Sequence, residues 1–409
     1  MSLQQDDRET ATGAEEFRTA MVAKLRQEGT IRSEAVARAM SVVPRHVFAP
    51  EFSLAQAYDP HQALVTRRDA NGLATSSVSA PQIQAFMLEQ ADVQPGMSVE
   101  EIGGGGYNAA LAAELAGSHG RVVTVDIDPF VTDRSEKFLG EAGYSRVDVV
   151  LADGNEPLED YYGPFDRVIV TVGAWDLPPG WTGQLTEGGT ITVPLRMRGI
   201  TRSITFRQYD DHFVSTSAEV CGFVRMQGSG AHDERLVLLR GKEVGLRFDE
   251  DPVPDVSGLD GVLERAKSEQ WSAVTVGQAE PFDSLYLWLA TSLPGFGMLS
   301  VDPELDTKTV TPANRMACPA IADGESLAYL GLRRTTDEVP TYEFGAYGHG
   351  PDAERLIDLI GEQIAIWNEK QRGGPGPVFR AYPAGTPDDR LPDGHVIDKR
   401  HVRLIISWP

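Results

Sequence analysis

The stretch SVEEIGGGGYNAALAAEL (residues 98–115) places four consecutive glycines between an apolar segment and an alanine-rich one. The first segment, residues 98–102, is typical of a buried strand, and residues 107–116 are typical of a helix. Glycine loses more conformational freedom on folding than any other residue, so four in a row do not serve stability. They indicate a place where the backbone turns sharply or lets a ligand come close.

The same alternation of apolar strands and helices continues on both sides of the glycines. Strands are predicted at residues 98–102, 121–127, 147–154, 165–173 and 188–195, and helices at residues 79–91, 107–116 and 130–143. Strands that alternate with helices form parallel βαβ units. We therefore predict an α/β fold with a doubly wound, mostly parallel sheet and helices on both faces.

Beyond residue 230 the sequence changes character. Residues 246–261 are acidic and rich in proline, which predicts a linker or a long surface loop. Strand-like segments follow at residues 326–334 and 401–408, with one clear helix at residues 352–374. We predict three parts: a disordered N-terminus (1–15), the α/β domain with N-terminal helices (16–230) and a C-terminal α+β region (231–409).

Composition excludes several classes of protein. The 409 residues carry a formal net charge of −23, which argues against nucleic acid as a partner, because phosphate binding requires basic surface. Two cysteines, Cys221 and Cys318, provide neither a disulfide framework nor a metal site. The N-terminus is polar and acidic, and no apolar run is long enough to span a membrane. We expect a cytoplasmic protein without a metal.

Three successive strand ends carry groups suited to an adenosine-containing ligand. The glycine loop follows the first strand, Asp126 ends the second, and Asp153 ends the third. In an open α/β sheet, ligands bind beyond the carboxyl ends of the strands. An acid at the second position accepts hydrogen bonds from ribose hydroxyls, and Asp153 is placed to face an adenine amino group.

The loop itself favours one ligand of this class. A dinucleotide fingerprint requires a third glycine at position 108, which is Asn108, and no triphosphate motif is present. The acidic Glu101 before the loop suits a cation, and S-adenosyl-L-methionine carries an ammonium group and a sulfonium. The expected residues that bind this cofactor, and its product S-adenosyl-L-homocysteine, are Glu101, Gly103, Gly104, Gly105, Tyr107, Asn108, Asp126, Ile127, Asp153 and Gly154.

Several motifs resemble the protein L-isoaspartate O-methyltransferases. They are VPRHVFAP (43–50), ATSSVSAPQIQAFMLE (74–89), EEIGGGGYNAALAAEL (100–115), VVTVDID (122–128) and LADG (151–154). The resemblance covers roughly residues 35–194. It implies a Rossmann-like methyltransferase domain and places Ser79 at the position of the family's active-site serine.

Two departures narrow the resemblance. The glycine loop is one residue shorter than in the repair enzymes, and the chain extends some 200 residues beyond them. Both features are similar to the lanthipeptide-associated methyltransferases of the FxLD type. That likeness implies a modified, cyclised precursor peptide as partner, whose aspartate is esterified, closes to a succinimide and can then open to isoaspartate.

Hydroxyl and guanidinium groups are the expected contacts for the substrate carboxylate. A carboxylate is already ionised at neutral pH, so methyl transfer requires positioning rather than a general base. Ser79 is the expected catalytic residue. The weaker substrate-binding candidates are Thr75, Ser76, Ser77, Arg196 and Arg198. The alternative for the hydroxyl cluster is capping of the helix at residues 79–91, and for the arginines it is a solvated surface.

Other functions stay open on the sequence alone. A repair enzyme for isoaspartate in damaged proteins shares all of the cofactor chemistry. A dinucleotide-dependent dehydrogenase is disfavoured by Asn108, and a non-catalytic peptide-binding scaffold is the alternative of another class. The C-terminal region is expected to form a peptide groove over the strand ends or to pair two chains as a homodimer, with a purely stabilising role as the alternative.

Overall fold

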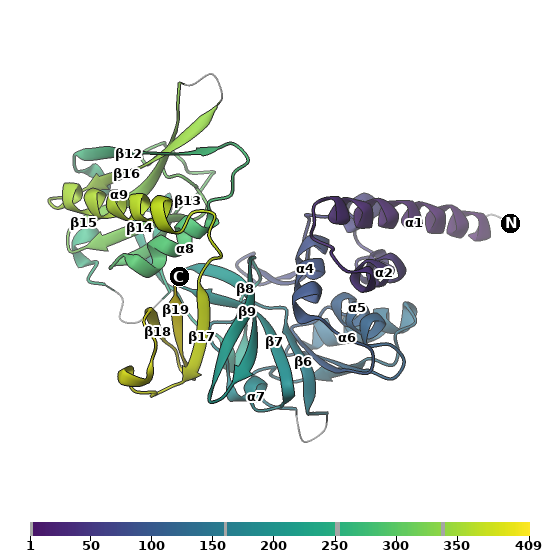
Figure 1. Ribbon diagram of the computed structural model, residues 1–409. Helices are drawn as coiled ribbons and strands as arrows, with labels where there is room; N and C mark the ends of the chain where they lie inside the picture. The colour runs from purple at the N-terminus through teal and green to yellow at the C-terminus, as the bar shows by residue number, and fades with distance from the viewer. Residues whose placement is uncertain (1–2, 159–161, 250–253, 337–339) are drawn as a thin grey trace.

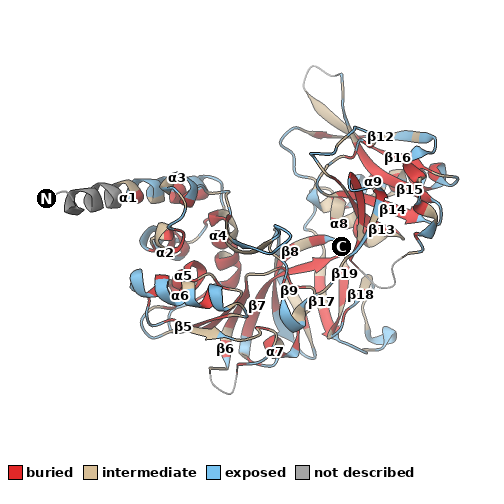
Figure 2. Cartoon of the chain, turned by 180° about the vertical axis from the view of Figure 1, so that it is seen from behind, coloured by how far each residue is buried: buried red, intermediate tan, exposed pale blue. Residues whose placement is uncertain are grey.

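The computed structural model describes residues 3–158, 162–249, 254–336 and 340–409, with side chains from residue 13 onward, and consists of two units side by side (Figure 1). The first unit contains a ten-stranded sheet in the order β18-β19-β17-β9-β8-β7-β6-β3-β4-β5. The second contains a seven-stranded sheet in the order β10-β11-β13-β14-β15-β16-β12. Buried residues follow the central strands of both sheets (Figure 2).

Half of the large sheet is the expected doubly wound core. Strands β3 (Ser98–Ile102), β4 (Arg121–Asp126), β5 (Asp148–Leu151), β6 (Phe165–Val170) and β7 (Leu185–Met197) are parallel. The chain runs outward from β3 to β5 and then returns to place β6 on the other side of β3. This reversal between β3 and β6 is a topological switch point, where ligands bind in such sheets.

Helices cover one face of the parallel strands. Helices α4 (Pro81–Ala91), α5 (Tyr107–Ala116) and α6 (Pro129–Glu141) share an apolar core with α1 (Leu3–Gln27) and α2 (Glu34–Val42). The other face differs from the expectation, because it is covered by the four-residue helix α7 (Pro179–Thr182) and by loops. The connection between β5 and β6 contains Pro157 and Pro164, which disfavour a long helix there.

The prediction that residues 1–15 are disordered is wrong for residues 3–15, because α1 begins at Leu3. Residues 1–2 lie outside the described residues. The α1 sequence has no proline and one glycine and is rich in good helix formers. Once its later turns pack in the core, extending the helix toward the N-terminus adds one hydrogen bond per residue at little cost.

The predicted C-terminal region is not one continuous unit. The second unit is formed by β10 (Arg235–Arg240), β11 (Val244–Phe248), β12 (Lys267–Gly277), β13 (Phe296–Val301), β14 (Cys318–Asp323), β15 (Ser326–Arg334) and β16 (Thr341–His349), with α8 (Asp283–Ser292) and α9 (Ala353–Lys370). The chain then returns to the first unit. There β17 (Val378–Pro383), β18 (His395–Asp398) and β19 (Val402–Ser407) extend the large sheet.

The antiparallel half of the large sheet explains this return. Strands β8 (Ile200–Tyr209) and β9 (His212–Val220) continue the sheet from β7, and the edge of β9 pairs with β17. An unpaired edge exposes backbone donors and acceptors, so β17 satisfies groups that β9 would otherwise leave open. The second unit is therefore inserted between β9 and β17. Of the predicted linker, residues 250–253 lie outside the described residues, and β11 occupies part of the rest.

Candidate active site

The four glycines connect β3 to α5, and each has its own physical reason. Gly103 and Gly106 have φ values of +87° and +88°, a region that favours glycine. A Cβ on Gly104 would lie 2.1 Å from both Glu101 Oε2 and Thr124 Oγ1. At Gly105 a Cβ would have a single neighbour, at 4.0 Å, so this glycine borders open space.

Glu101 lies under this loop and is almost fully buried. Its Oε2 accepts a hydrogen bond from Thr124 Oγ1 at 2.7 Å, whereas Oε1 has no well-formed hydrogen bond within the described chain. Burial raises the pKa of Glu101 to about 6, and the Thr124 hydroxyl and the nearby Asn108 amide act in the opposite direction. Asn108, the second residue of α5, lines a small cavity together with Glu101. Its Nδ2 also has no well-formed acceptor within the described chain. A buried carboxylate oxygen in this state fits a ligand that brings an ammonium group, and the Asn108 amide N–H fits an acceptor on the same ligand.

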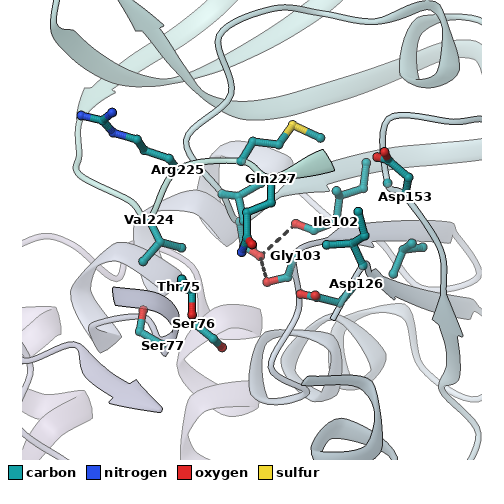
Figure 3. A pocket seen from close by; sticks show the side chains of 16 residues that line it. Thr75, Ser76, Ser77, Ile102, Gly103, Asp126, Asp153, Val224, Arg225 and Gln227 are labelled. Carbon is teal, nitrogen blue, oxygen red and sulfur yellow. Dashed lines mark hydrogen bonds between the residues drawn. The ribbon is translucent and has the colours of Figure 1, made fainter. Parts of the chain in front are cut away.

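Asp126 lies at the carboxyl end of β4 and lines the neighbouring cavity together with Gly103 (Figure 3). Ile127 and Gly154 line the same cavity. Its Oδ1 accepts a hydrogen bond from the Asp128 backbone N–H at 2.9 Å. Burial raises the pKa of Asp126 to about 6. The carboxylate keeps acceptor capacity toward the cavity, because each carboxylate oxygen accepts two hydrogen bonds.

Asp153 also lines this cavity, but both of its oxygens already serve the protein. Oδ1 accepts from the Asn155 N–H at 3.0 Å and Oδ2 from the Ser229 N–H at 2.8 Å. Burial acts to raise the pKa of Asp153, but the Ser229 and Asn155 donors outweigh it and lower the pKa below its ordinary value. The carboxylate is held as an anion that orders the loop around it.

Sequence reasoning missed Thr171, which follows β6 and borders the same cavity. Its Oγ1 lies 3.0 Å from the Ile102 carbonyl oxygen and 2.9 Å from that of Gly103, the hydrogen bonds drawn in Figure 3. Thr171 therefore fixes the start of the glycine loop. The rule that found Asp126 and Asp153, a polar residue at the end of a parallel strand, would have found it too.

A second and larger cleft opens beside the first, with an empty volume of about 1770 Å³ against about 540 Å³, open solvent at both mouths included. One wall is the hairpin of β1 (Leu64–Arg68) and β2 (Ala74–Val78). The other wall is formed by residues 222–227, here called the roof segment. Thr75, Ser77 and most of the roof segment line both cavities, so the two are continuous.

The roof segment was also missed, because long-range hydrogen bonds position it. The Gly173 N–H donates to the Val224 carbonyl oxygen at 2.7 Å, and the Met226 N–H donates back to the Gly173 carbonyl oxygen at 3.2 Å. Arg225 of this segment lines both cavities, and its side chain projects away from Asp126 (Figure 3). No local pattern in the sequence identifies such a crossing.

The predicted hydroxyl cluster, Thr75, Ser76, Ser77 and Ser79, borders the cavities described above. Ser79 lines the larger cleft and the small cavity at Glu101, and its hydroxyl makes no hydrogen bond to any residue in the described ranges. The helix cap is Ala80, without a side-chain bond, so the capping explanation for Ser79 is wrong. Thr75, Ser76 and Ser77 belong to strand β2, not to a cap, and Ser76 Oγ accepts from Thr66 Oγ1 at 3.1 Å.

The two arginines expected at the substrate lie elsewhere, and the solvated-surface alternative is also wrong. Arg196 is buried and pairs with Glu234 at 2.7 Å and Asp249 at 2.8 Å. Arg198 donates to the carbonyl oxygens of Ala290 and Leu293 in the second unit. Neither lines the cavities described above. These side chains hold the two units together, a role that only the inserted unit makes possible.

Tyr107 is placed differently from Asn108. It borders the small cavity, but its ring is buried against Phe48 and below the Arg45 guanidinium. Burial raises the pKa of the Tyr107 hydroxyl, which makes no hydrogen bond within the described chain. Tyr107 therefore contributes a packed wall.

A parallel sheet with a glycine loop and two carboxylates at its switch point defines a protein that binds an adenosine-containing cofactor. More specifically, the chain belongs to the protein-L-isoaspartate(D-aspartate) O-methyltransferase family, because a family model of that description matches residues 16–230. By family it is an S-adenosyl-L-methionine-dependent carboxyl methyltransferase, which confirms the expected class and cofactor.

Curated relatives agree with this assignment. The protein-L-isoaspartate O-methyltransferase of Methanopyrus kandleri is 40% identical over 182 residues, which are 44% of this chain and 76% of that protein. The Pyrobaculum neutrophilum enzyme is 39% identical over 178 residues, 43% of this chain and 82% of its own. The Hyperthermus butylicus enzyme is 34% identical over 223 residues, 52% of this chain and 89% of its own.

Two solved structures are similar at low identity. One, described as a protein-L-isoaspartate O-methyltransferase, has a TM-score of 0.49 and 20% identity and covers 89% of this chain and 96% of its own. A Plasmodium falciparum structure assigned to this enzyme, in complex with S-adenosyl-L-homocysteine, has a TM-score of 0.45 and 17% identity, with 51% and 97% covered. In the part of the chain that the structure describes, no helix is long and apolar enough to cross a membrane.

Proposed function

We propose that the chain methylates the carboxylate of an isoaspartate or aspartate residue in a peptide. The observation that carries the proposal is the continuity of the two cavities. A small cavity with buried carboxylates lies at the switch point, and a wide cleft opens from it to the surface past Thr75 and Ser77. A buried cofactor and an extended substrate can then meet at one point.

The cofactor would occupy the smaller cavities. Glu101 and Asn108 supply the unpaired oxygen and amide for the amino-acid end, under Gly103, Gly104 and Gly105. Asp126 supplies acceptors for ribose hydroxyls, and Ile127, Asp153 and Gly154 border the remaining space. When bound, S-adenosyl-L-methionine supplies an electrophilic methyl group on a sulfonium.

The substrate carboxylate would lie between Ser79 and Ser77, which line both the wide cleft and the small cavity at Glu101. A carboxylate has a pKa near 3.9 and is ionised at neutral pH, so the chain needs no general base. Its contribution is to orient and desolvate the nucleophile, and orientation alone supplies roughly 7–11 kcal/mol in favourable cases. The Ser79 hydroxyl, which has no hydrogen-bond partner among the described residues, is the expected donor.

The narrower proposal is that the substrate is a cyclised, ribosomally made peptide, whose aspartate is esterified. The size of the open cleft supports it, because a ring occupies more width than an extended chain. In the ester, the nitrogen of the next peptide bond attacks the carbonyl carbon, methanol leaves, and a succinimide remains. Water then opens the imide to isoaspartate or aspartate.

Mass spectrometry distinguishes the two substrates. The protein is incubated with cofactor and one of three peptides: a linear isoaspartyl peptide, its aspartyl isomer and a cyclised aspartyl peptide. Methylation of the isoaspartyl form alone supports repair-type chemistry, and methylation of the cyclised aspartyl form alone supports the narrower proposal. If calorimetry shows cofactor binding but no peptide gains a methyl group, the catalytic proposal is wrong and the scaffold alternative stands.

A further inference from the structure

The edge of the second sheet carries exposed apolar side chains. Strand β10 is the outermost strand of that sheet, and within the described residues it pairs only with β11. Leu236 and Leu238 lie on the same face of the strand and are 55% and 53% exposed. The ladder with β11 is regular over the four residues from Arg235 to Leu238. The free side of β10 is therefore a template for another strand.

The opposite edge of the same sheet shows how such a template is usually protected. Strand β12 carries the charged residues Lys267 and Glu269, and its pairing with β16 shifts register between Trp271 and Thr275. Charges and irregular register both discourage edge-to-edge pairing. Strand β10 carries its charged residues, Arg235 and Arg240, only at its two ends, and its register shifts only after Leu238, so Leu236 and Leu238 lie in a regular apolar stretch between them. The difference favours a partner at β10.

Charge indicates what kind of partner fits. Residues 235–248, which form the β10–β11 hairpin, contain Arg235, Arg240, Lys242 and Arg247 against the single acid Glu243. Glu243 is buried, accepts a hydrogen bond from the Thr307 N–H and pairs with Arg240 Nε at 3.1 Å. Arg247 lies 3.9 Å from Glu234, so Arg235 and Lys242 contribute most of the uncompensated positive charge of the hairpin. This basic patch belongs to a chain with a net charge of −23, so it attracts an acidic segment locally.

A second copy of the chain fits less well. Full antiparallel pairing of two β10 strands would place each Arg235 opposite the other copy's Arg240. Like charges directly opposite each other destabilise a strand pair.

The edge also begins beside the candidate active site. Glu234, the residue before β10, forms an ion pair with Arg225 of the roof segment, and Arg225 lines both cavities. The six residues of β10 span about 20 Å, enough for a substrate segment that leaves the cleft.

We infer that β10 binds an acidic, extended segment of the peptide substrate by strand addition, next to the residue that is methylated. Main-chain hydrogen bonds along β10 supply affinity, Leu236 and Leu238 receive alternate apolar side chains, and the arginines select acidic neighbours. The inference rests on the proposed function, because it places another part of the same substrate.

The first experiment uses hydrogen exchange on the full-length protein. The probe is a synthetic acidic peptide of about twelve residues with alternating leucine and glutamate and no aspartate. Slower exchange of the β10 amides, with little change in β12, is the expected result. Unchanged β10 exchange overturns the inference. Protection of β10 that depends on protein concentration without peptide assigns the edge to a second copy and also overturns it.

The second experiment measures methylation of a short isoaspartyl peptide and of the same peptide extended by the acidic segment on either side. One extended form should have a KM about tenfold lower. The double variant R235E/R240E should abolish that advantage and leave the short peptide unchanged. The control R355E/R390E makes the same charge change on exposed arginines of α9 and of residues 388–390, and should keep the advantage.

The outcomes separate the two proposals. If the short peptide is methylated and no extension lowers KM, the β10 inference is wrong and the proposed function stands. If no peptide is methylated but β10 is protected, the proposed function is wrong and β10 is a binding edge for another acidic partner.

Discussion

The cofactor cavity and the substrate cleft share walls but are built in different ways. Apart from Ser76 and the residues that line both, the cofactor cavity takes its residues from consecutive strand ends between residues 102 and 172. The substrate cleft joins the β1–β2 hairpin at residues 64–78 to the roof segment at residues 222–227, and the roof is tied to the second unit through Arg225 and Glu234. One site is local, and the other depends on how distant parts of the chain meet.

Because the two sites are built differently, a substitution can change one of them and leave the other unchanged. A local site keeps its geometry as long as its own strands fold. A site completed by a distant segment responds to changes in the inserted unit without any change in the cofactor residues. Five substitutions or conditions test that separation, from the largest expected effect to the smallest.

The largest effect is expected from Asp249→Ala, which removes one partner of the buried Arg196. A buried charge that loses its partner costs about 3–5 kcal/mol of folding free energy, with the lower end expected here because Glu234 remains. Chemical denaturation measures the loss. Asp211→Ala, at an exposed ion pair with Arg390, is the control and should not change stability measurably. Equal stability of the two variants would mean that the interface does not hold the units together.

Gly104→Ala tests the cofactor cavity by adding an atom rather than removing one. The new Cβ would lie 2.1 Å from Glu101 Oε2 and Thr124 Oγ1, and overpacking of this kind costs about 1–3 kcal/mol. Thermal unfolding should show the loss, together with weaker cofactor binding. Gly140→Ala in α6 has its nearest neighbour at 3.9 Å and should be neutral or stabilising. A stable Gly104 variant that binds cofactor normally would contradict the geometry of the loop.

Asp126→Ala should weaken cofactor binding by roughly 1–3 kcal/mol, because buried hydroxyls of the ligand would lose their acceptor. Isothermal titration calorimetry measures the affinity. Asp148→Ala, on the exposed start of β5, is the matched control and should bind as the wild type does. An unchanged affinity for the Asp126 variant would remove this residue from the site.

Cofactor affinity should depend on pH through Glu101, whose pKa burial raises to about 6. Below about pH 6 the empty cavity holds Glu101 protonated, so a cationic ligand must displace that proton, and affinity falls by up to about tenfold per pH unit. Above about pH 6 the carboxylate is ionised and affinity levels off. Glu101→Gln should bind weakly at every pH and lose most of the dependence. Asp126, with a pKa also raised to about 6, accounts for the rest.

Ser79→Ala should have the smallest effect and the most selective one. Loss of one hydrogen bond to the substrate carboxylate costs about 1 kcal/mol, so turnover falls about fivefold while cofactor affinity stays constant. Steady-state kinetics and calorimetry measure the two quantities, and Ser41→Ala in α2, which lines none of these cavities, is the matched control. If cofactor binding falls together with turnover, Ser79 belongs to the cofactor cavity and the division between the two sites is not as drawn.

The local site is also the part that could be predicted from sequence. The glycine loop, Asp126 and Asp153 were found because the carboxyl ends of parallel strands meet at one edge, which is a rule about neighbouring segments. The roles of Arg196 and Arg198 could not be predicted in this way. Their partners lie more than 35 residues away in a unit whose position depends on packing between sheets.

The same limit applies to the fold. The parallel strands from β3 to β7 follow from hydrophobic pattern alone. The return of β17 to β9 does not, because a strand-like segment such as residues 401–408 carries no mark of the sheet it joins. The boundary expected at residue 230 therefore lies close to the start of the second unit. It gives no sign that the first unit resumes at Val378.

The return of β17–β19 to the first sheet has a consequence for biosynthesis. On the ribosome, the parallel core and the cofactor cavity emerge before the inserted unit, so they can form early. The edge of β9 then stays bare until some 160 further residues have been synthesised and β17 arrives. During that interval the nascent chain exposes an unpaired strand, the condition under which chains aggregate or recruit chaperones. A chain cut after Gly230 would remain in that vulnerable state permanently.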